Sequence, residues 1–240
     1  EVFSTYYISF SNDIAYTIRS LADNGKGKIY VGTHNKGLYV FDKASGSFSK
    51  HIFSRENPEY RLLHSLFYKN KKLYIGASNM LFVYDEETQT LERHKINSDP
   101  EVSLQAMHVL SDKKILLGSY NGKTSLFDTQ THKVEKIHSE DGKCGISVIH
   151  FLDYDENRVL LGTYGNDLCV YDKNKQSIYQ DPQLLTGYSA IYGVLEADNG
   201  DLWASSNYGL LFYDKTDENW ITFKKSDGLQ SNEFNVGALS

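Results

Sequence analysis

The chain has 240 residues, of which 25 are lysine or arginine and 31 are aspartate or glutamate, so its formal net charge is −6. This mildly acidic balance argues against a protein that binds nucleic acid, because such proteins favour a basic surface. The sequence also lacks the run of about 18 apolar residues that would cross a bilayer as a helix.

Short runs of Val, Ile, Tyr and Phe, each bounded by Gly, Asn or Asp, are typical of β-strands. Four such runs follow one another near the N-terminus, and we name them strands a to d. They are TIRSLAD (17–23), KIYVGT (28–33), GLYVFD (37–42) and SFSKHIF (47–53). Polar turns such as NGKGK join them, so they are expected to pair as a meander.

Strand c recurs along the chain at an almost constant interval. It returns as MLFVYD, KTSLFD, DLCVYD and LLFYD, and the five runs end at Asp42, Asp85, Asp128, Asp172 and Asp214, which are 43, 43, 44 and 42 residues apart. Upstream, the small residues of strand b follow the same interval at Gly32, Gly76, Gly118, Gly162 and Ala204. Four strands in about 40–45 residues are typical of one blade of a β-propeller.

The sequence therefore predicts an all-β fold, a β-propeller of four-stranded blades. Five blades are complete, at about residues 11–53, 60–96, 102–138, 145–180 and 188–224. Residues 1–10 and 232–240 resemble single strands of two further, partial blades. Because a ring closes only when its last blade has all its strands, we expect this chain to be a fragment of a larger, seven-bladed propeller.

Two segments, IRSLADNGKGKIYVGTHNKGLYVFD (18–42) and IYGVLEADNGDLWASSNYGLLFYD (191–214), resemble the two-component regulator propeller repeat. The segment DGLQSNEFNVGA (227–238) is similar to the end of the second propeller in the periplasmic sensor region of Bacteroidetes hybrid two-component systems. The resemblance covers nearly the whole chain, although the second and third repeats are degenerate. It implies that further blades, an immunoglobulin-like domain, a membrane span and a histidine kinase would follow in the full protein, which would act as a homodimer.

The turns between strands b and c each carry an asparagine, and three have a tyrosine nearby. In a propeller these turns lie around the mouth of the central channel, where tyrosine rings and amide groups suit a carbohydrate. The alternative is that Asn is common in hairpins because it tolerates left-handed backbone geometry. The candidate ligand-binding residues here are His34, Asn35, Tyr120, Asn121, Tyr164, Asn166, Asn207 and Tyr208.

Strand a offers a second pattern, counted from a recurring leucine. Two residues before that leucine lie Arg19, His64, His108, His150 and Gly193, in successive blades. The first four are further candidates, as an electropositive funnel for an anion or, less favoured, as metal ligands. The structural alternative is that each histidine is buried between blades and forms hydrogen bonds with backbone groups.

Other residues are interpreted as structural. The recurring aspartates are expected to cap turns by accepting backbone N–H groups, and Trp203 and Trp220 are expected in the core. The two cysteines, Cys144 and Cys169, give neither a disulfide framework nor a metal-ligand spacing. No motif of a phosphate loop or of a nucleophile elbow is present.

The favoured hypothesis is a non-catalytic, periplasmic sensor region of an inner-membrane protein whose signal and membrane segments lie outside this chain. The resemblance implies that it recognises an oligosaccharide and regulates polysaccharide use. We expect no cofactor and no metal, and the acidic charge predicts no nucleic-acid partner. A propeller lyase or hydrolase is the alternative, with Arg19, His64, His108, His150 and Tyr164 as its catalytic candidates. A protein-interaction platform is a third hypothesis, and the architecture alone does not choose among them.

Overall fold

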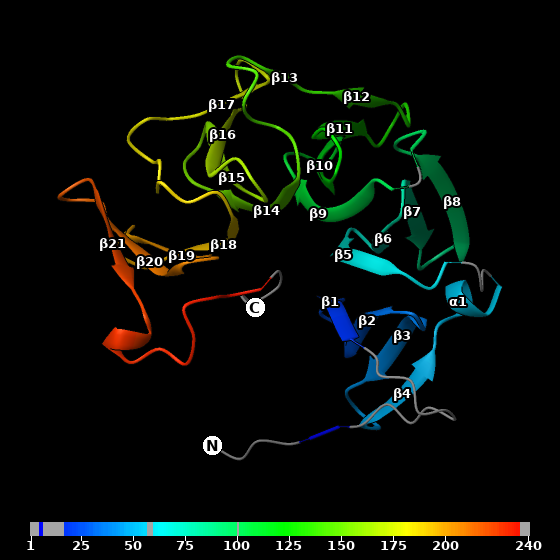
Figure 1. Cartoon of the computed structure of the whole chain (residues 1–240). Helices are drawn as coiled ribbons and strands as arrows, with labels where there is room; N and C mark the ends of the chain where they lie inside the picture. Colours follow the sequence, from blue (N-terminus) through cyan, green and yellow to red (C-terminus); the bar gives the residue numbers. More distant parts are fainter. Residues whose placement is uncertain (1–4, 7–16, 57–59, 100, 236–240) are drawn as a thin grey trace. The chain divides into compact units, whose positions relative to one another are not determined.

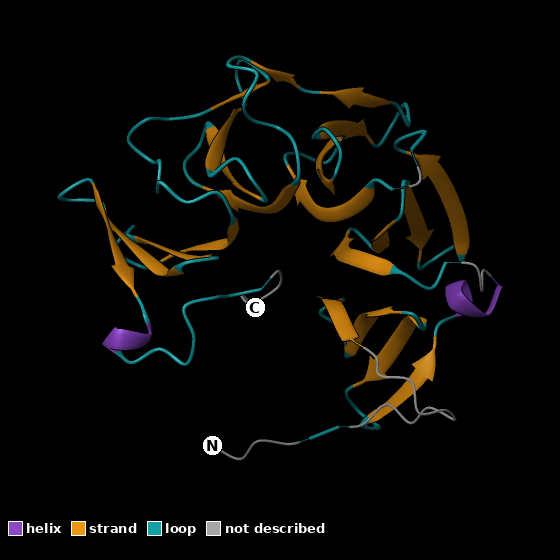
Figure 2. Ribbon diagram, in the orientation of Figure 1, coloured by secondary structure: helices purple, strands orange, loops and turns teal. Residues whose placement is uncertain are grey.

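The computed structural model describes residues 5–6, 17–56, 60–99 and 101–235. The chain divides into two compact units, residues 1–104 and 105–240, built from sheets whose strands are antiparallel and follow chain order, apart from one added strand, β13 (Figures 1 and 2). The all-β prediction is therefore confirmed. The blade boundaries and the blade number stay predictions, and the partial blades at 1–10 and 232–240 fall largely outside the described residues.

The first unit contains two four-stranded sheets and one short helix. Its first sheet has the order β1-β2-β3-β4 and its second the order β5-β6-β7-β8. The elements are β1 Thr17–Asp23, β2 Lys28–His34, β3 Gly37–Asp42, β4 Ser47–Lys50, α1 Ile52–Glu56, β5 Leu63–Lys69, β6 Lys72–Ala77, β7 Met80–Asp85 and β8 Thr90–Lys95. Leu38, Leu63, Leu73 and Ile75 are fully buried in the core of this unit.

The second unit contains three sheets, the first of which begins with β9 at the boundary between the units. The middle sheet gains a fifth strand, because β13 pairs in parallel with β17. The elements are β9 Ser103–Val109, β10 Lys114–Tyr120, β11 Ser125–Asp128, β12 Val134–Lys136, β13 His138–Ser139, β14 Val148–Asp153, β15 Arg158–Thr163, β16 Leu168–Asp172, β17 Ser177–Tyr179, β18 Ile191–Glu196, β19 Leu202–Ser206, β20 Gly209–Asp214, β21 Asn219–Phe223 and the 3₁₀ turn η1 Lys225–Asp227.

The recurring glycine of strand b marks where the next sheet approaches most closely. A Cβ added at Gly118 would lie 2.7 Å from the Val148 carbonyl oxygen, and one at Gly162 would lie 2.8 Å from that of Ile191. Val148 begins β14 and Ile191 begins β18, and each of these strands lies at the edge of the following sheet. Neighbouring sheets in this unit can therefore pack this closely only where strand b has no side chain.

The recurring aspartates cap the turns after strand c, as predicted. The carboxylates of Asp85, Asp128, Asp172 and Asp214 each accept backbone N–H groups from the residues two and three positions later, at 2.7–3.1 Å. Asp42 accepts the N–H of Ser45 at 2.8 Å. These hydrogen bonds hold the turn that returns the chain into strand d.

Strand d of the first sheet is shorter than predicted, because β4 ends at Lys50 and α1 begins at Ile52. Between them, the buried His51 donates its N–H to the Leu38 carbonyl at 3.0 Å and accepts the N–H of Phe53 at its Nδ1 atom, at 3.1 Å. The His51 imidazole thus satisfies one of the N–H groups that have no partner within the first turn of a helix. The apolar residues Ile52 and Phe53 gave no sign of it in the sequence.

The two cysteines, whose pairing the sequence alone left open, form a disulfide. Cys144 and Cys169 have Cα atoms 5.9 Å apart and lie 25 residues apart in sequence. Both side chains are buried in the second unit, in a core cluster with Leu161, Tyr171 and Ile178. Sequence spacing could not reveal this pair, because Cys144 lies in the loop after β13, and β13 joins the sheet of Cys169 through its pairing with β17.

Candidate functional site

Three tyrosines from three successive sheets of the second unit lie beside one another. We call Tyr120, Tyr164 and Tyr192 the tyrosine row. The ring centroids of Tyr120 and Tyr164 are 5.5 Å apart, and those of Tyr164 and Tyr192 are 6.2 Å apart. Tyr164, in the centre, is 46% exposed. The row therefore presents an aromatic surface to solvent at one end of the sheets.

The backbone places each member of the row at the end of a strand. Tyr120 closes β10, Tyr164 follows β15, and Tyr192 is the second residue of β18. Tyr164 donates its N–H to the Ser147 carbonyl at 2.9 Å and forms an isolated bridge with Ala190. Tyr192 is the extra residue of a β-bulge between Ile191 and Gly193. Bulges often re-aim one side chain, as here.

Asparagines follow two members of the row in the sequence, Asn121 directly after Tyr120 and Asn166 two residues after Tyr164. Asn166 donates its side-chain amide to the Ile146 carbonyl at 3.4 Å, and Asn121 donates its N–H to Ser147 Oγ at 3.2 Å. Burial, with smaller contributions from Tyr164 and Glu233, raises the pKa of Tyr192. Flat apolar ring faces with amide and hydroxyl groups at their edges suit a ligand that has an apolar face and several hydroxyls.

A second aromatic pair in this unit involves the turn between β19 and β20. The rings of Tyr188 and Tyr208 stack with centroids 5.3 Å apart, and Tyr208 is 53% exposed. Next to it, Asn207 Oδ1 is buried and accepts no hydrogen bond within the described part of the chain. Two predicted site residues, Asn207 and Tyr208, therefore belong to this turn.

The asparagines divide between the two interpretations of their turns. Asn35, Asn79 and Asn121 have φ of +82°, +44° and +56°, so left-handed turn geometry accounts for them. Asn166 and Asn207 are not among the residues with positive φ in the described segments. For these two, turn chemistry is no explanation, and a role of their amide groups in binding stays a prediction.

The histidines of the second unit are held by protein groups. Burial lowers the pKa of both His108 and His150, so both rings are neutral at pH 7. His150 donates from Nε2 to the Val194 carbonyl at 2.9 Å, and His108 Nε2 is 3.2 Å from Asp153 Oδ1. A neutral ring that is bonded to the backbone fits the structural alternative for His150.

In the first unit, Arg19, His34 and His64 lie close enough to interact electrostatically. Burial, aided by the charges of Arg19 and His34, lowers the pKa of His64 to about 4. Both ring nitrogens of His64 are buried and have no hydrogen-bond partner among the described residues. With neutral imidazoles at positions 64, 108 and 150, the predicted electropositive funnel loses most of its charge at neutral pH.

Strand pairing also corrects the equivalence of the strand a positions. Arg19 and His64 are bulge residues, between Ile18 and Ser20 and between Leu63 and Ser65. His150 instead follows the bulge of its strand and pairs with Gly162. The residue equivalent to Arg19 and His64 in that strand is Ile149, and in β18 it is Tyr192. The four basic residues therefore do not form one equivalent series.

The position of the small residue in the last sheet is corrected for a related reason. In the last sheet Gly193 pairs with Ser205 and not with Ala204. In the sheet before it, His150 pairs with Gly162. Ser205 is therefore the counterpart of Gly162. The turn after β19 is one residue shorter than the turn after β2, because Ser206 pairs with Gly209 while Thr33 pairs with Gly37. Counting back from the aspartate of strand c therefore gives a position that is wrong by one residue.

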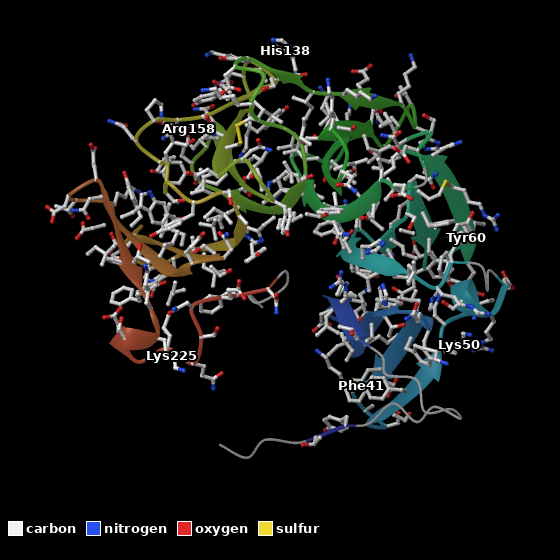
Figure 3. All side chains as sticks on the ribbon, in the orientation of Figure 1. Phe41, Lys50, Tyr60, His138, Arg158 and Lys225 are labelled. Carbon is white, nitrogen blue, oxygen red and sulfur yellow. A yellow bond between two sulfur atoms is a disulfide. The ribbon has the colours of Figure 1, made fainter. Side chains whose placement is uncertain are left out.

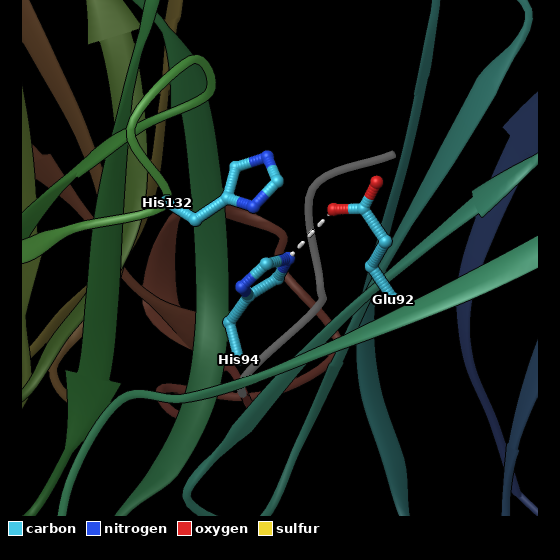
Figure 4. Close-up of side chains that lie close together, drawn as sticks. All are labelled: Glu92, His94 and His132. Carbon is cyan, nitrogen blue, oxygen red and sulfur yellow. Dashed lines mark hydrogen bonds and ion pairs between the residues drawn. The ribbon is translucent and has the colours of Figure 1, made fainter.

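On the outer strand β8 of the first unit, His94 and Glu92 form a further polar pair. His94 Nε2 is 3.2 Å from Glu92 Oε2, and this pair is marked in Figure 4. The two residues are two positions apart on one strand, so their side chains share a face. The pair involves none of the predicted site residues.

No family model and no curated protein matches this sequence. Among solved structures, the chain is similar to the extracellular domain of the hybrid two-component system BT4673 from B. thetaiotaomicron, with a TM-score of 0.73 and 20% identity over 94% of this chain and 30% of that one. It is also similar to the extracellular domain of the hybrid two-component system BT3049 from the same organism, with a TM-score of 0.66 and 16% identity over 85% of this chain and 29% of that one.

A third similar structure is the WD40 β-propeller domain of Doa1, with a TM-score of 0.60 and 15% identity over 86% of this chain and 69% of that one. These likenesses establish the fold, a succession of sheets like those of β-propellers. The chain spans less than a third of either B. thetaiotaomicron domain.

Proposed function

We propose that this chain is part of the extracytoplasmic sensor region of a hybrid two-component system, and that it binds an oligosaccharide at the tyrosine row. The row carries the proposal, because three tyrosines from separate sheets make one solvent-facing surface with Tyr164 at its centre. Sugar rings have apolar C–H faces that pack on aromatic rings, while their hydroxyls need amide and hydroxyl partners.

The disulfide supports a location outside the cytoplasm. Disulfides persist in oxidising compartments such as the periplasm and are rare in the cytosol. The pair Cys144–Cys169 is buried and joins a loop to a central strand. In the described residues no helix has the length and apolar character to span a membrane. A membrane anchor, an immunoglobulin-like domain, a histidine kinase and homodimerisation belong to the proposed full protein.

Binding would act as a signal only through a difference in affinity between two arrangements of the receptor. The ligand can shift such an equilibrium by no more than that difference. Under this proposal the chain supplies the recognition surface and the attached kinase supplies the output, which regulates the use of the polysaccharide.

The alternative function, a lyase or hydrolase that uses the histidines and Arg19, has less support than ligand binding. His150 is bonded to a backbone carbonyl, and His108 lies within hydrogen-bond distance of Asp153. The lyase or hydrolase alternative needs these groups to act together on one substrate. Neither the observed hydrogen bonds nor the register of the strands supports joint action of these groups on one substrate.

A thermal-shift screen of the chain against defined neutral and acidic oligosaccharides tests the proposal. A ligand present at about a hundred times its dissociation constant adds about 2.7 kcal/mol to the free energy of unfolding. We expect one class of sugar to raise the melting temperature of the wild type and of Ile221→Ala, an exposed outer-strand control in the same unit. The shift should disappear in Tyr164→Ala. A shift that survives in Tyr164→Ala would contradict the proposal.

A further inference from the structure

We propose that the Cys144–Cys169 disulfide and Ser147 position the tyrosine row, so that the row forms a rigid surface only in the oxidised chain. This inference rests on the proposed function, because it concerns the surface that the function assigns to the ligand. In Figure 3 the disulfide is the yellow bond between two sulfur atoms. It joins the loop 140–147, which connects β13 to β14, to β16, the middle strand of its sheet.

The second half of this loop holds the turn between β10 and β11. The Gly145 carbonyl accepts the backbone N–H of Thr124 at 2.6 Å and the hydroxyl of Thr124 at 3.1 Å. Ser147 donates its N–H to the Gly122 carbonyl at 3.1 Å and accepts the N–H of Asn121 at its Oγ atom, at 3.2 Å. These hydrogen bonds fix the turn to the loop, directly after the strand that ends with the first tyrosine of the row.

The same loop also holds the centre of the row. The Ser147 carbonyl accepts the N–H of Tyr164 at 2.9 Å, and the Ile146 carbonyl accepts the side-chain amide of Asn166 at 3.4 Å. Ser147 therefore joins the turns of two neighbouring tyrosines, through its N–H, its Oγ atom and its carbonyl. We infer that this residue sets the 5.5 Å separation between the ring centroids of Tyr120 and Tyr164.

Ser147 needs support from its surroundings. Its φ is +52°, a left-handed value that costs energy for a residue with a side chain. Such a conformation persists only where neighbouring groups fix it. Cys144 lies three residues earlier, and its bond to Cys169 in the middle strand supplies a covalent fixed point. Without that bond, we expect the loop to lose the geometry that joins the two turns.

Oxidation, and not the ligand, creates this fixed point. Formation of the bond from two thiols releases two electrons and two protons, which a disulfide oxidant accepts as it becomes a dithiol. Cys144 and Cys169 are only 3% and 0% exposed, so a reductant reaches the bond only when the surrounding structure opens. The disulfide is therefore a permanent cross-link in an oxidising compartment and not a reversible switch.

Nuclear magnetic resonance of the folded chain tests the inference. Backbone order parameters are about 0.85 in rigid segments and below about 0.6 in flexible ones. In the double variant Cys144→Ala/Cys169→Ala, the order parameters of the Asn121 and Tyr164 amides should fall from about 0.85 to below about 0.6. The nuclear Overhauser effects between the first two rings of the row should disappear. Order parameters and ring contacts equal to those of the wild type would overturn the inference.

An internal control separates positioning from a loss of stability. The amide of Asn207, in a turn of the next sheet, should keep its wild-type order parameter in the double variant. A lower free energy of unfolding alone does not change order parameters while the chain stays folded. Equal loss of order at Asn207 and at the two turns of the row would therefore refute a local role of the disulfide.

A second variant keeps the disulfide and isolates Ser147. Ala190 holds the corresponding place before β18, where its carbonyl accepts the N–H of Asn207 at 3.4 Å, so Ser147→Ala should fold. This change removes only the Oγ acceptor. The order parameter of the Asn121 amide should therefore fall, while that of the Tyr164 amide stays at the wild-type value. Equal changes at both amides, or no change at either, would contradict the role of Ser147.

Ser189→Ala is the matched control. Ser189 is an exposed serine in the next loop, and its carbonyl accepts the N–H of Gly165 at 2.8 Å, a bond that the substitution keeps. It should leave both order parameters of the row unchanged. Because none of these measurements uses a sugar, failure of the thermal-shift screen contradicts only the proposed function. An unchanged row in the double variant contradicts only this inference.

Discussion

Removing the disulfide should destabilise the second unit by an amount that follows from its position. The bond closes a loop with a sequence separation of 25 residues. In the chain-entropy account, such a cross-link stabilises the folded state by about 3.5 kcal/mol at 25 °C, between the values for loops of 15 and 100 residues. We expect the double variant Cys144→Ala/Cys169→Ala to lose about that much, because alanine leaves no buried hydroxyl in the cluster.

Urea unfolding monitored by tryptophan fluorescence measures this loss. Trp203 and Trp220 both lie in the second unit, on β19 and β21, so the signal reports on the unit that holds the bond. With a slope of about 2 kcal/mol/M, the unfolding midpoint should fall by about 1.7 M. A reductant should lower the wild-type midpoint to that of the variant and leave the variant unchanged. Equal midpoints for the oxidised wild type and the variant would refute the reasoning, as would two free thiols in the purified protein.

Three further predictions concern stability. Burial lowers the pKa of both His51 and His64 from 6.5 to about 4. The free energy of unfolding is therefore unaffected by these two groups above pH 6.5 and decreases as the pH drops from 6.5 towards 4. At pH 5 each histidine should lower it by about 2 kcal/mol. Urea midpoints measured from pH 7.5 to 5 should therefore fall, and less steeply in His64→Gln; an unchanged slope would contradict this. Burial raises the pKa of Glu86, but hydroxyl donors from Tyr68 and Tyr30 outweigh it and lower the pKa. Glu86→Gln should cost about 1–3 kcal/mol by circular dichroism melting, against about 0.5 kcal/mol or less for the exposed control Glu87→Gln; equal effects would refute a special role for this carboxylate. Gly162→Ala should cost about 1–3 kcal/mol in the same melt, since its Cβ would lie 2.8 Å from a carbonyl oxygen; an unchanged melting temperature would show that the sheets are not so close.

Much of the fold could be predicted from the sequence, because its signals are local and repeated. A strand of alternating or continuous apolar residues, a Gly or Asn turn, and an aspartate that caps the next turn each depend on a few neighbouring residues. Repetition then identified the sheets without any long-range information. The capping role of Asp85 and Asp128 was predicted for this reason, and their hydrogen bonds confirm it.

The rest depended on features with no local signature. A bulge adds one residue to a strand without changing its composition, so the equivalence of His150 with His64 was wrong by one position. Tyr192 was not predicted as a site residue for the same reason, because the sequence does not show that it is the bulge residue of β18. The disulfide joins two segments that are 25 residues apart in sequence, and only the folded chain brings them together.

The most direct test of the account compares two substitutions of the central tyrosine of the row. Isothermal titration with the oligosaccharide that stabilises the wild type should give nearly the same dissociation constant for Tyr164→Phe, because the ring is kept. Tyr164→Ala should raise that constant at least tenfold, which corresponds to about 1.4 kcal/mol. If both variants bind as tightly as the wild type, the tyrosine row is not the recognition surface, and the central claim is contradicted.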